Sequence, residues 1–330
     1  MKFVIFGDTH VGFQKSSDLY HNVTYTFFDD VVKFCLQHDI KQVVHLGDFF
    51  HDRKELNTKS QNVAHRIADL FEKNKIIMFL ITGNHDVYYK DSLVPSTLEL
   101  FRKYEYITVI DNVTNYGKDI VFSPWGIIPQ PSQTKAKYCF GHFEIIGFKM
   151  NNSYACEKGQ SIDDFKHFKH VWSGHFHIPS NNGNITCLGS PYPMTFHDVN
   201  SVRGFYVWDD GKTEFHAFDK APKFIIMETD KIDRTLIKGN IIKLVFNEDY
   251  GNLQNQKLID EVQSFNPIRF QTDFSHIKIE GTEDKRDESE EKIGLLNHKE
   301  IINEYVKKSS FPEHIKPSVL LSMIEKLKEE

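Results

Sequence analysis

The chain of 330 residues is long enough for one large domain with smaller additions, and its 40% hydrophobic and 13% aromatic content argues against a largely disordered protein. Lysine and arginine total 40 against 46 aspartates and glutamates, so the formal charge of -6 does not indicate a nucleic-acid binder, and any such contact must come from a local patch. The four scattered cysteines argue against a disulfide framework or a zinc ribbon. We expect no signal peptide, no membrane span and a cytoplasmic location.

Strands and helices are expected to alternate at the start of the chain. Apolar runs that end at Gly7, Gly47 and Gly83 have the length of buried strands. Between them, apolar residues recur at helical spacing over 27–35 and again over 63–71. This order of strand, helix, strand, helix and strand predicts an α/β layer architecture.

A strand-rich stretch is expected to follow a further helix over residues 96–104. The first domain is predicted to end near Pro222, which gives a unit of residues 1–222. Four runs in it have the composition of strands, and we assign them to a second sheet: 107–110, 120–122, 185–188 and 204–208.

The next segment, residues 223–280, is predicted to form a small α+β unit without obvious catalytic residues. Apolar runs at 224–227, 241–246 and 277–279 have the pattern of strands, and an amphipathic stretch around Leu258 has that of a helix. We therefore expect a second, smaller domain after the first.

The end of the chain is predicted to be a tether followed by two helices. Residues 281–293 are rich in acidic side chains and hold no aromatic one, which is the composition of a solvated linker. Residues 294–330 hold two short amphipathic helices that are separated at Pro312. This helix-loop-helix is too small to be stable alone, so we expect it to dock into a groove of a partner. The alternative is that it packs back on its own domain.

Residues of metal-ligand type follow the ends of five apolar runs. Each run stops at a glycine, and the polar residue comes next or one residue later. A strand that stops at glycine turns sharply, often with positive φ, and its backbone can pass close to whatever lies beyond. Open α/β sheets bind ligands at the carboxyl ends of their strands, so we expect these side chains at one place. They are Asp8, His10, Asp48, Asn84, His142, His175 and His177.

This set of residue types predicts a centre of two divalent metal ions. Asp8 and His10 are two residues apart, so their side chains leave the strand on the same side and can bind one ion. Asp48 can give one carboxylate oxygen to each of two ions. Nitrogen and oxygen donors without a thiolate suit manganese, iron, zinc or magnesium. Taken singly, each Gly-Asp or Gly-Asn pair is an ordinary turn signal and each histidine an ordinary core residue. The joint pattern of five strand ends is what favours the metal centre.

The expected reaction is hydrolysis of a phosphoester. A hydroxide that bridges the two ions would be the nucleophile, because divalent cations lower the pKa of bound water to about 7. His85, which follows Asn84, would point past the ions and protonate the leaving oxygen or stabilise the charged transition state. Asp86 would either orient His85 or cap a helix.

The motifs GDTH, GDFFHDR, GNHD, GHFE and GHFH resemble, in order and in rough spacing, those of the calcineurin-like metallophosphoesterase superfamily. Within it, the stretches 141–148 and 171–177 make the chain similar to the SbcD/Mre-eleven nuclease branch, especially its T-even-type phage form. The resemblance covers most of the residues up to Pro222. It implies an α/β fold, a metallophosphoesterase sandwich of two mixed β-sheets flanked by helices, with a small α+β capping domain that binds DNA and a C-terminal helix-loop-helix.

An activity, a cofactor and partners are also implied by the resemblance. They are manganese-dependent cleavage of DNA, with two Mn²⁺ ions and with Mg²⁺ or another divalent ion as alternatives, 3′-to-5′ exonuclease action on duplexes and endonuclease action on single strands. The resemblance further implies a role in DNA recombination and repair. It implies a homodimer, and an SMC-like ATPase large subunit of the SbcC/Rad-fifty type that binds through the terminal helices.

Residue roles carry over from the family position by position. His85 would be the catalytic histidine, and His51 would position the scissile strand, with a surface turn histidine as the alternative reading. The first ion would be held by Asp8, His10, Asp48 and His177, and the second by Asp48, Asn84, His142 and His175.

DNA contacts are predicted at three further positions. Arg53 and Lys54 would meet phosphates, unless they are only a solvated charged turn. Ser190 lies in a segment that resembles a family loop near the cleft.

Two other functions stay open on the sequence alone. One is a phosphatase or cyclic-nucleotide phosphodiesterase of the same superfamily that acts on a small substrate, although the GDFFHDR motif differs from the GDxxDRG spacing of protein phosphatases. The other is a metal-free scaffold that uses the fold only for interaction. The full ligand set and His85 argue against the scaffold.

Overall fold

The first of two main β-sheets is built on the alternating strands and helices at the start of the chain. The computed structural model describes residues 1–89, 91–150, 154–275 and 277. The sheet has the order β12-β11-β1-β2-β3-β4, in which β1 to β4 are parallel and β11 is antiparallel to both of its neighbours. Its strands are β1 (Lys2–Phe6), β2 (Gln42–His45), β3 (Ile77–Ile81), β4 (Ile107–Ile110), β11 (Gly204–Asp209) and β12 (Lys212–Ala217).

The second main sheet has the order β5-β6-β7-β8-β10-β9. Its four inner strands are parallel, and β5 and β9 are antiparallel edge strands. Its strands are β5 (Thr114–Tyr116), β6 (Ile120–Ser123), β7 (Tyr138–His142), β8 (His170–Gly174), β9 (Ser180–Asn182) and β10 (Ile185–Cys187). Both sheets are therefore mixed, and together they confirm the predicted metallophosphoesterase sandwich.

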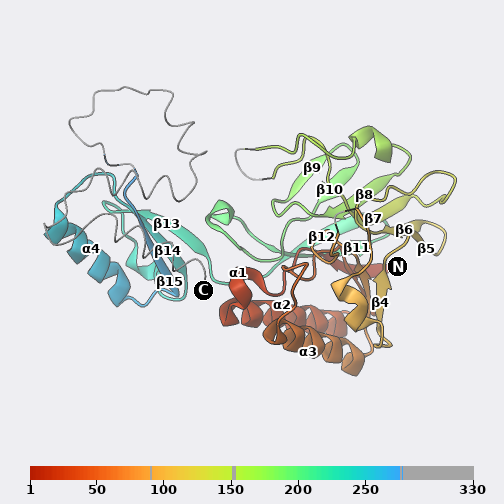
Figure 1. The fold of residues 1–330 in the computed structure, drawn as a ribbon, viewed down its shortest axis with the longest axis horizontal. Helices are drawn as coiled ribbons and strands as arrows, with labels where there is room; N and C mark the ends of the chain where they lie inside the picture. Colours follow the sequence, from red (N-terminus) through yellow and green to blue (C-terminus); the bar gives the residue numbers. More distant parts are fainter. Residues whose placement is uncertain (90, 151–153, 276, 278–330) are drawn as a thin grey trace, which may run out of the picture. The chain divides into compact units, whose positions relative to one another are not determined.

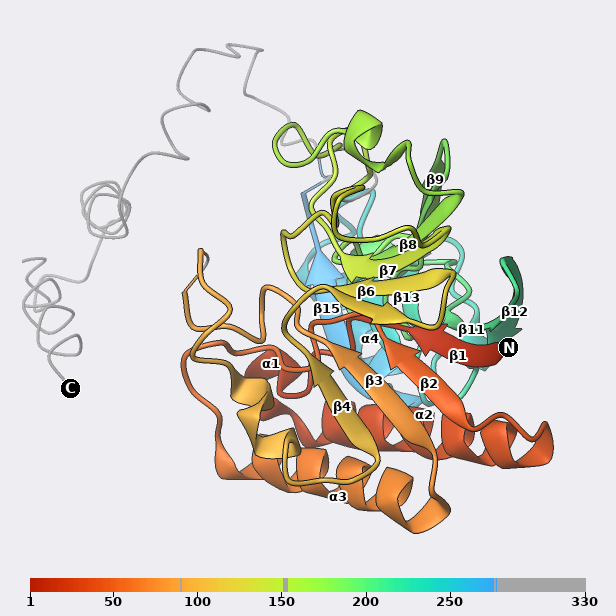
Figure 2. The same cartoon turned by 90° about the vertical axis from the view of Figure 1, so that its right-hand side faces the viewer.

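Alternating side chains of β1 explain how the layers pack. Val4 and Phe6 join the apolar cluster that includes α2 and α3, whereas Phe3 and Ile5 join the cluster that faces the second sheet. The long helices α2 (Asp18–Gln37) and α3 (Thr58–Asn74) cover the face of the first sheet that is turned away from the second sheet, as Figures 1 and 2 show. Burial on both faces is why β1, β2 and β3 are almost continuously apolar.

Short helical segments complete the first 222 residues. The helix predicted over 96–104 is a 3₁₀ helix, so this expectation was wrong in type and length. These segments are α1 (Phe13–Ser16), η1 (Thr97–Phe101), η2 (Ile162–Phe165) and η3 (Phe196–Asp198).

Two strands lie in a different sheet from the one predicted. β4 and β11 belong to the first sheet, because β4 pairs with β3 and β11 pairs with β1 in the register Lys2↔Asp209. Pairing between residues so far apart in sequence depends on the whole packing and leaves no mark on the local apolar pattern. The strands at 120–122 and 185–188 do belong to the second sheet.

A third, smaller sheet follows residue 222. It has three parallel strands in the order β13-β14-β15, and the helix α4 lies between β14 and β15 in the chain. The third strand, β15, precedes the predicted run at 277–279, and only residue 277 of that run is described. The elements are β13 (Phe224–Glu228), η4 (Arg234–Leu236), β14 (Ile241–Val245), α4 (Asn252–Ser264) and β15 (Arg269–Asp273).

The predicted acidic linker at 281–293 and the helix-loop-helix at 294–330 lie outside the described residues. The boundary near residue 222 stays a prediction. Within the described part of the chain, no helix combines the length and the apolar content that crossing a membrane requires.

Candidate metal centre

The ends of five strands bring the predicted ligands together. Gly47 follows β2, and its carbonyl accepts a hydrogen bond of 2.9 Å from the backbone N–H of Asp8, which follows β1. The N–H of His175, just after β8, donates to Asp8 Oδ1 at 2.9 Å. His142 ends β7, and its Nε2 lies 2.9 Å from Oδ1 of Asn84, which comes after β3. All the predicted ligands therefore lie at one edge of the two sheets.

One group of ligand atoms, which we call the Asp8 half, consists of Asp8, His10 and His177. One donor atom from each lies within 4.8 Å of the others. The Nε2 atoms of His10 and His177 are 2.9 Å apart. Among the described residues, Asp8 Oδ2 is buried without a hydrogen-bond partner. An orphaned buried carboxylate oxygen is costly, so this half has the features of a cation site.

The other group, which we call the Asn84 half, consists of Asn84, His142 and His175. Asn84 Oδ1 lies 2.9 Å from His142 Nε2 and 2.9 Å from His175 Nδ1. His142 and His175 also form a potential metal group with Asp48, again with donor atoms within 4.8 Å of one another.

Asp48 connects the two halves through its two carboxylate oxygens. Oδ1 is 3.4 Å from Nε2 of His142, and Oδ2 is 3.8 Å from Nε2 of His10. The carboxylate is 1% exposed, and its Oδ1 also accepts a hydrogen bond of 2.8 Å from the backbone N–H of His85. The two oxygens of Asp48 thus face one half each, which is the geometry that a ligand shared by two ions would need.

The hydrogen bonds of His142 supply a test of whether a cation fits. Its Nδ1 lies 2.7 Å from the carbonyl of Leu46, so Nδ1 carries the proton and donates. In the neutral ring, Nε2 is then an acceptor that faces two other acceptors, Asn84 Oδ1 and Asp48 Oδ1. Three acceptors converge where a positive charge has to lie. The residues present therefore fit a divalent ion.

Three of the histidines are held in the form that a metal ion needs. Burial lowers the pKa of His175 to about 3 and that of His177 to about 4, and it holds the pKa of His10 well below its usual range. Neutral imidazole is the form that binds a metal. At His142, burial opposes the charge, but Asp48 and Asp8 outweigh it and raise the pKa to about 9. A proton on this ring can therefore supply the positive charge between the acceptors, and a metal ion bound there would replace it.

The buried carboxyl of Asp8 also calls for a cation. Burial raises its pKa to about 8, with Asp48 adding to the shift, whereas the neighbouring histidines hold the pKa of Asp48 well below its usual range against the effect of burial. A divalent ion would keep both carboxylates ionised.

The glycines at the strand ends act mainly through close approach. A Cβ on Gly174 would lie 2.7 Å from the carbonyl oxygen of Leu46 and 2.9 Å from His142 Nδ1. Of the five glycines, only Gly47 has a positive φ, at 102°. Positive φ instead occurs at the ligands, including Asp8 at 56° and Asp48 at 54°. Non-glycine residues in this region carry strain that is typical of functional sites.

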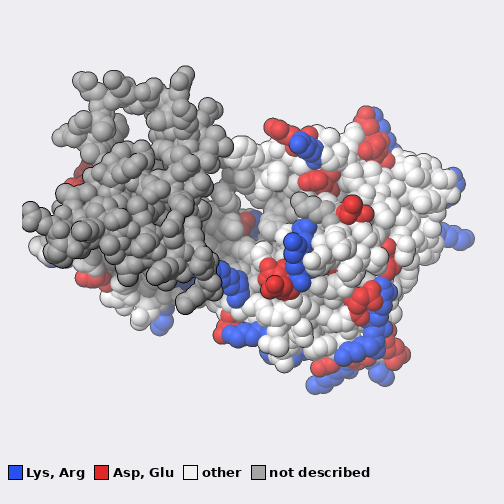
Figure 3. Space-filling view, in the orientation of Figure 1, with Lys and Arg blue, Asp and Glu red and all other residues white. Residues whose placement is uncertain are grey.

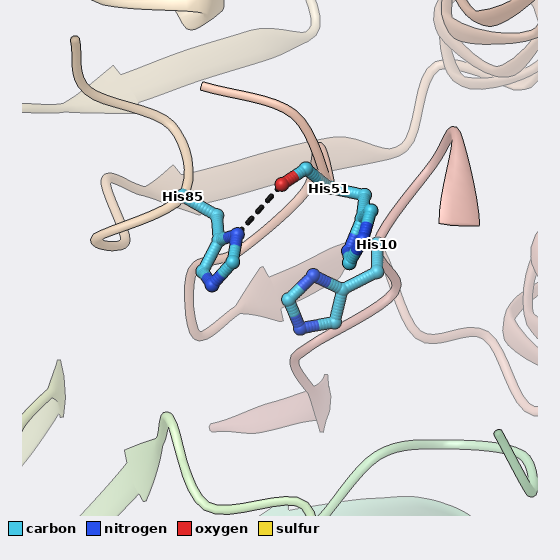
Figure 4. Close-up of side chains that lie close together, drawn as sticks. All are labelled: His10, His51 and His85. Atoms are coloured by element: carbon cyan, nitrogen blue, oxygen red, sulfur yellow. Dashed lines mark hydrogen bonds between the residues drawn. The ribbon is translucent and has the colours of Figure 1, made fainter. Parts of the chain in front are cut away.

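His85 and His51 lie beside the Asp8 half. Their rings are stacked with centroids 5.7 Å apart, and both are edge-on to His10 (Figure 4). His85 Nδ1 donates to the His51 carbonyl at 2.6 Å, so the neutral ring leaves Nε2 as an acceptor. The predicted catalytic histidine is therefore next to the ligands, and its orientation is set by the backbone of His51.

Asp86 has neither of the two roles predicted for it. Its carboxylate accepts hydrogen bonds from the backbone N–H groups of Gly83, Phe49 and Phe50. It therefore ties the loop after β3 to the loop after β2. This role could not be predicted, because it depends on which loops become neighbours in the fold.

The predicted DNA-contacting residues differ in their surroundings. Arg53 and Lys54 line an open cavity that also includes His51 and His85, with Lys54 Nζ 6.0 Å from the centre of the Tyr88 ring. Ser190 is 2% exposed, and its hydroxyl donates to the Tyr192 carbonyl. This burial does not favour the DNA contact predicted for Ser190, which is instead a loop residue beside the site.

His45 is a supporting residue that the sequence reasoning missed. It is buried on β2, where its Nδ1 accepts from Gly47 N–H at 3.2 Å and its Nε2 lies 2.9 Å from Thr9 Oγ1. Since Nδ1 accepts, Nε2 carries the proton and donates to the hydroxyl of Thr9. Thr9 stands between two predicted ligands. A polar residue inside an apolar strand was the available signal.

Comparison with known proteins establishes the family. Residues 1–227 match the Calcineurin-like phosphoesterase family, so the chain belongs to it and is a phosphoester hydrolase by class. Members of this family use divalent metal ions, and the two halves described above are groups that could hold them.

Two particular proteins are similar to this chain. Exonuclease subunit 1 of Enterobacteria phage T4 is 30% identical over 228 residues, which cover 65% of this chain and 67% of that protein. The crystal structure of the Pseudomonas putida nuclease MPE aligns with a TM-score of 0.28 at 19% identity. That alignment covers 44% of this chain and 62% of the nuclease, so this chain spans less than two thirds of it.

Proposed function

We propose that this protein is a two-metal DNA nuclease that hydrolyses phosphodiester bonds, with Mn²⁺ as its ion and Mg²⁺ or another divalent ion as substitutes. The observation that carries the proposal is the position of Asp48, with Oδ1 3.4 Å from Nε2 of His142 and Oδ2 3.8 Å from Nε2 of His10. One buried carboxylate between two sets of nitrogen and oxygen donors is the arrangement that two-metal hydrolytic sites need.

The ligands would divide between two ions. Divalent ions held there would neutralise charge on a phosphodiester and make a water acidic enough to attack at neutral pH. Asp48 would serve both ions. The first ion would add Asp8, His10 and His177, and the second would add Asn84, His142 and His175.

His85 would hold the proton that the leaving oxygen needs. Its Nδ1–H is fixed on the carbonyl of His51, so Nε2 is the atom that exchanges a proton with the substrate. Its backbone N–H also donates to Asp48 Oδ1, which ties the proton donor to the shared ligand. Rotation of the His85 ring would break the 2.6 Å hydrogen bond to the His51 carbonyl. The stacked ring of His51 restricts this rotation further.

The substrate strand would lie over the cavity beside His85. This cavity has a volume of about 560 Å³ and is lined by His51, Asp52, Arg53, Lys54, Glu55, Asn57 and His85. Arg53 and Lys54 would meet backbone phosphates, and His51 would position the scissile strand. On the part of the face in Figure 3 that is not grey, Lys and Arg mostly lie next to Asp and Glu. In this acidic chain, we therefore expect DNA to be bound through a small local contact.

For the activity and its setting, we propose 3′-to-5′ exonuclease action on duplexes and endonuclease action on single strands, within a recombination and repair complex in the cytoplasm. The similar phage protein is named an exonuclease subunit, which supports both a nuclease and a partner. The proposed partner is an SMC-like ATPase of the SbcC/Rad-fifty type that binds residues 294–330, and the proposed protein is a homodimer whose second domain, residues 223–280, contacts DNA.

A nuclease assay with end-labelled duplex and circular single-stranded DNA tests the proposal. We expect cleavage of both with Mn²⁺ and none with a chelator. Bis-p-nitrophenyl phosphate and p-nitrophenyl phosphate run alongside separate the nuclease from a phosphatase or small-substrate phosphodiesterase. Hydrolysis of the small esters without any cleavage of DNA would contradict the nuclease and favour that alternative.

Deletion of residues 294–330 tests the proposed partner contact. We expect the shortened protein to hydrolyse bis-p-nitrophenyl phosphate at the full-length rate, because all the proposed ligands precede the deletion. Co-purification with the ATPase should be abolished. Unchanged binding of the ATPase would refute the docking role of the terminal helices.

A further inference from the structure

The backbone carbonyl of His177 is held by donors from two distant parts of the chain. The N–H of Ser190 donates to it at 3.1 Å. The guanidinium of Arg203, which stands just before β11, donates to it through Nη1. Arg203 is 3% exposed, so a buried cation contacts the backbone of a proposed metal ligand.

The direction of the Arg203 side chain is fixed by Asp198. Arg203 Nη2 donates to Asp198 Oδ1, and the aspartate is 4% exposed. Oδ2 of the same carboxylate accepts from the N–H groups of Met194 and Thr195, each at 2.9 Å, which caps η3. The guanidinium therefore spans two acceptors in a fixed geometry, which suits its planar fork of donors.

Stability alone is a weak reason for this arrangement. Two charges out of water carry a desolvation cost that their attraction only partly repays, and apolar residues of similar volume are often at least as stabilising. Within the described part of the chain, the acceptor that Arg203 has outside its ion pair is the carbonyl of His177. If the buried guanidinium of Arg203 has a function besides stability, it acts through its contact with His177.

We propose that Arg203 is a positioning residue that sets the place of His177, and that it acts on only one of the two metal positions. This inference rests on the metal centre of the proposed function. Nε2 of His177 faces Nε2 of His10 in the Asp8 half. In the Asn84 half, His142 is held instead by the carbonyl of Leu46. Loss of Arg203 should therefore loosen the first ion and spare the second.

The competing explanation is that the Arg203–Asp198 pair only holds the fold. A double variant separates the two explanations. Arg203→Met alone would leave the Asp198 charge buried and unpaired, which is strongly destabilising. Arg203→Met with Asp198→Asn removes both charges, and the asparagine oxygen can still cap η3. We expect this variant to keep the fold, and it deprives the His177 carbonyl of its side-chain donor.

The experiment is a Mn²⁺ titration of the full chain by calorimetry, with the bound metal measured by elemental analysis and by electron paramagnetic resonance. Wild type should bind two ions per chain and show the spectrum of a coupled pair. In the double variant, one ion should bind roughly 10- to 100-fold more weakly, the scale seen when residues that support a metal ligand are removed, while the other keeps its affinity. The spectrum should then change to that of a single isolated ion.

Two further variants keep the result interpretable. Arg203→Lys retains the charge beside Asp198 but cannot reach both acceptors, so we expect a smaller loss at the same ion. Arg102→Met removes an exposed arginine that pairs with Glu99 and Asp111 and not with a proposed ligand, and it should change neither ion. Thermal unfolding of each variant reports whether the fold is kept.

The possible results point in different directions. If the double variant and Arg203→Lys both bind two ions with wild-type affinity, Arg203 has no positioning role, even if Arg203→Met alone is unstable. Equal weakening of both ions would also overturn the assignment. If wild type itself takes up no ion tightly, the proposed two-metal function fails, and this result is separate because it appears before any variant is made.

Discussion

The two halves of the proposed metal centre are supported in different ways. In the Asn84 half, the backbone carbonyl of Leu46 fixes His142, and the ring of Trp125 lies 5.7 Å from that of His142 and 5.1 Å from that of His175. The Asp8 half joins His10 to His177, 167 positions away in sequence, and a buried ion pair holds this third ligand. Backbone support tolerates substitution, whereas side-chain support can be removed by a single change.

Gly174 lies where the two halves meet. A Cβ there would be 2.9 Å from His142 Nδ1 and 3.0 Å from Asp8 Oδ2, besides 2.7 Å from the Leu46 carbonyl oxygen. Real Cβ atoms do not make such contacts with a buried backbone, so any side chain at this position displaces both halves together.

Substitution Gly174→Ala should therefore have the largest effect. We expect loss of both Mn²⁺ ions and of all measurable DNA cleavage, because without the ions a water would keep its pKa of about 15.7 and not attack at neutral pH. The measurement is metal content by elemental analysis together with the nuclease assay. Retention of one ion with normal affinity would show that the halves are independent at this position.

The matched control is Gly117→Ala, since a Cβ on Gly117 would meet nothing within 4 Å. Gly117 has a φ of 63°, so alanine should cost on the order of 1 kcal/mol in unfolding free energy from backbone strain. Cleavage should be unchanged. Loss of cleavage in the control would mean that backbone strain anywhere in the second sheet disrupts the site.

His85→Ala is expected to have the next largest effect, through chemistry and not through metal binding. The ring touches the backbone of His51 and lies beside His10, but both halves of the centre remain complete without it. We expect two bound ions and a fall in the cleavage rate of roughly 100- to 10,000-fold, as is typical when a general acid is removed. The measurement is the single-turnover rate on duplex DNA at saturating Mn²⁺.

A leaving group that needs no proton sharpens this test. Hydrolysis of bis-p-nitrophenyl phosphate releases a good leaving group, so His85→Ala should lose less rate on this ester than on DNA. Equal losses on both substrates would argue that His85 stabilises charge in the transition state and does not donate a proton. Full activity on DNA would refute any catalytic role.

Local sequence predicted the parts of the centre that lie at strand ends. Apolar runs that stop at glycine before Asp8, Asp48 or Asn84 mark places where parallel strands deliver polar groups to one edge, and the structure brings those groups within hydrogen-bonding reach of one another. Periodicity was also enough to predict the long helices α2 and α3.

Long-range contacts could not be predicted in the same way. Asp86 ties two loops together, and Arg203 reaches a carbonyl 26 residues away in sequence. The pairing of β11 with β1 is of the same kind. Each depends on which segments become neighbours, and apolar periodicity carries no such information. Positive φ at the ligands, where it was expected at the glycines, likewise follows from how tightly the strand ends pack.

A smaller effect is expected from changes at residues that would contact the DNA backbone but lie in neither half of the centre. The pair Arg53→Ala and Lys54→Ala removes two charges from the cavity beside His85. We expect DNA binding to weaken and the slope of log affinity against log salt on duplex DNA to fall by about 0.9 for each phosphate that the variant no longer neutralises. Hydrolysis of bis-p-nitrophenyl phosphate should not change. Lys33→Ala serves as the control, because it removes an exposed lysine of α2 that is paired with Asp29. An unchanged salt slope in the double variant would refute the phosphate contacts.

The smallest effect on cleavage is expected for a change that acts on stability in acid, and it probes the support of the Asp8 half through Thr9 and His45. Burial lowers the pKa of His45 to about 3, whereas an unfolded histidine has a pKa of about 6.5. Between these values the unfolded chain binds a proton that the folded chain refuses, so His45 should lower the unfolding free energy as pH falls, by up to about 1.4 kcal/mol per pH unit. The His45→Gln variant keeps a side-chain donor to Thr9 but has no group that titrates there, so metal-free denaturant unfolding between pH 6.5 and pH 4 should show a shallower decline than wild type. The exposed His38→Gln variant should follow wild type, and a decline of equal slope in His45→Gln would show that His45 is not the neutral buried donor that its hydrogen bonds to Gly47 and Thr9 indicate.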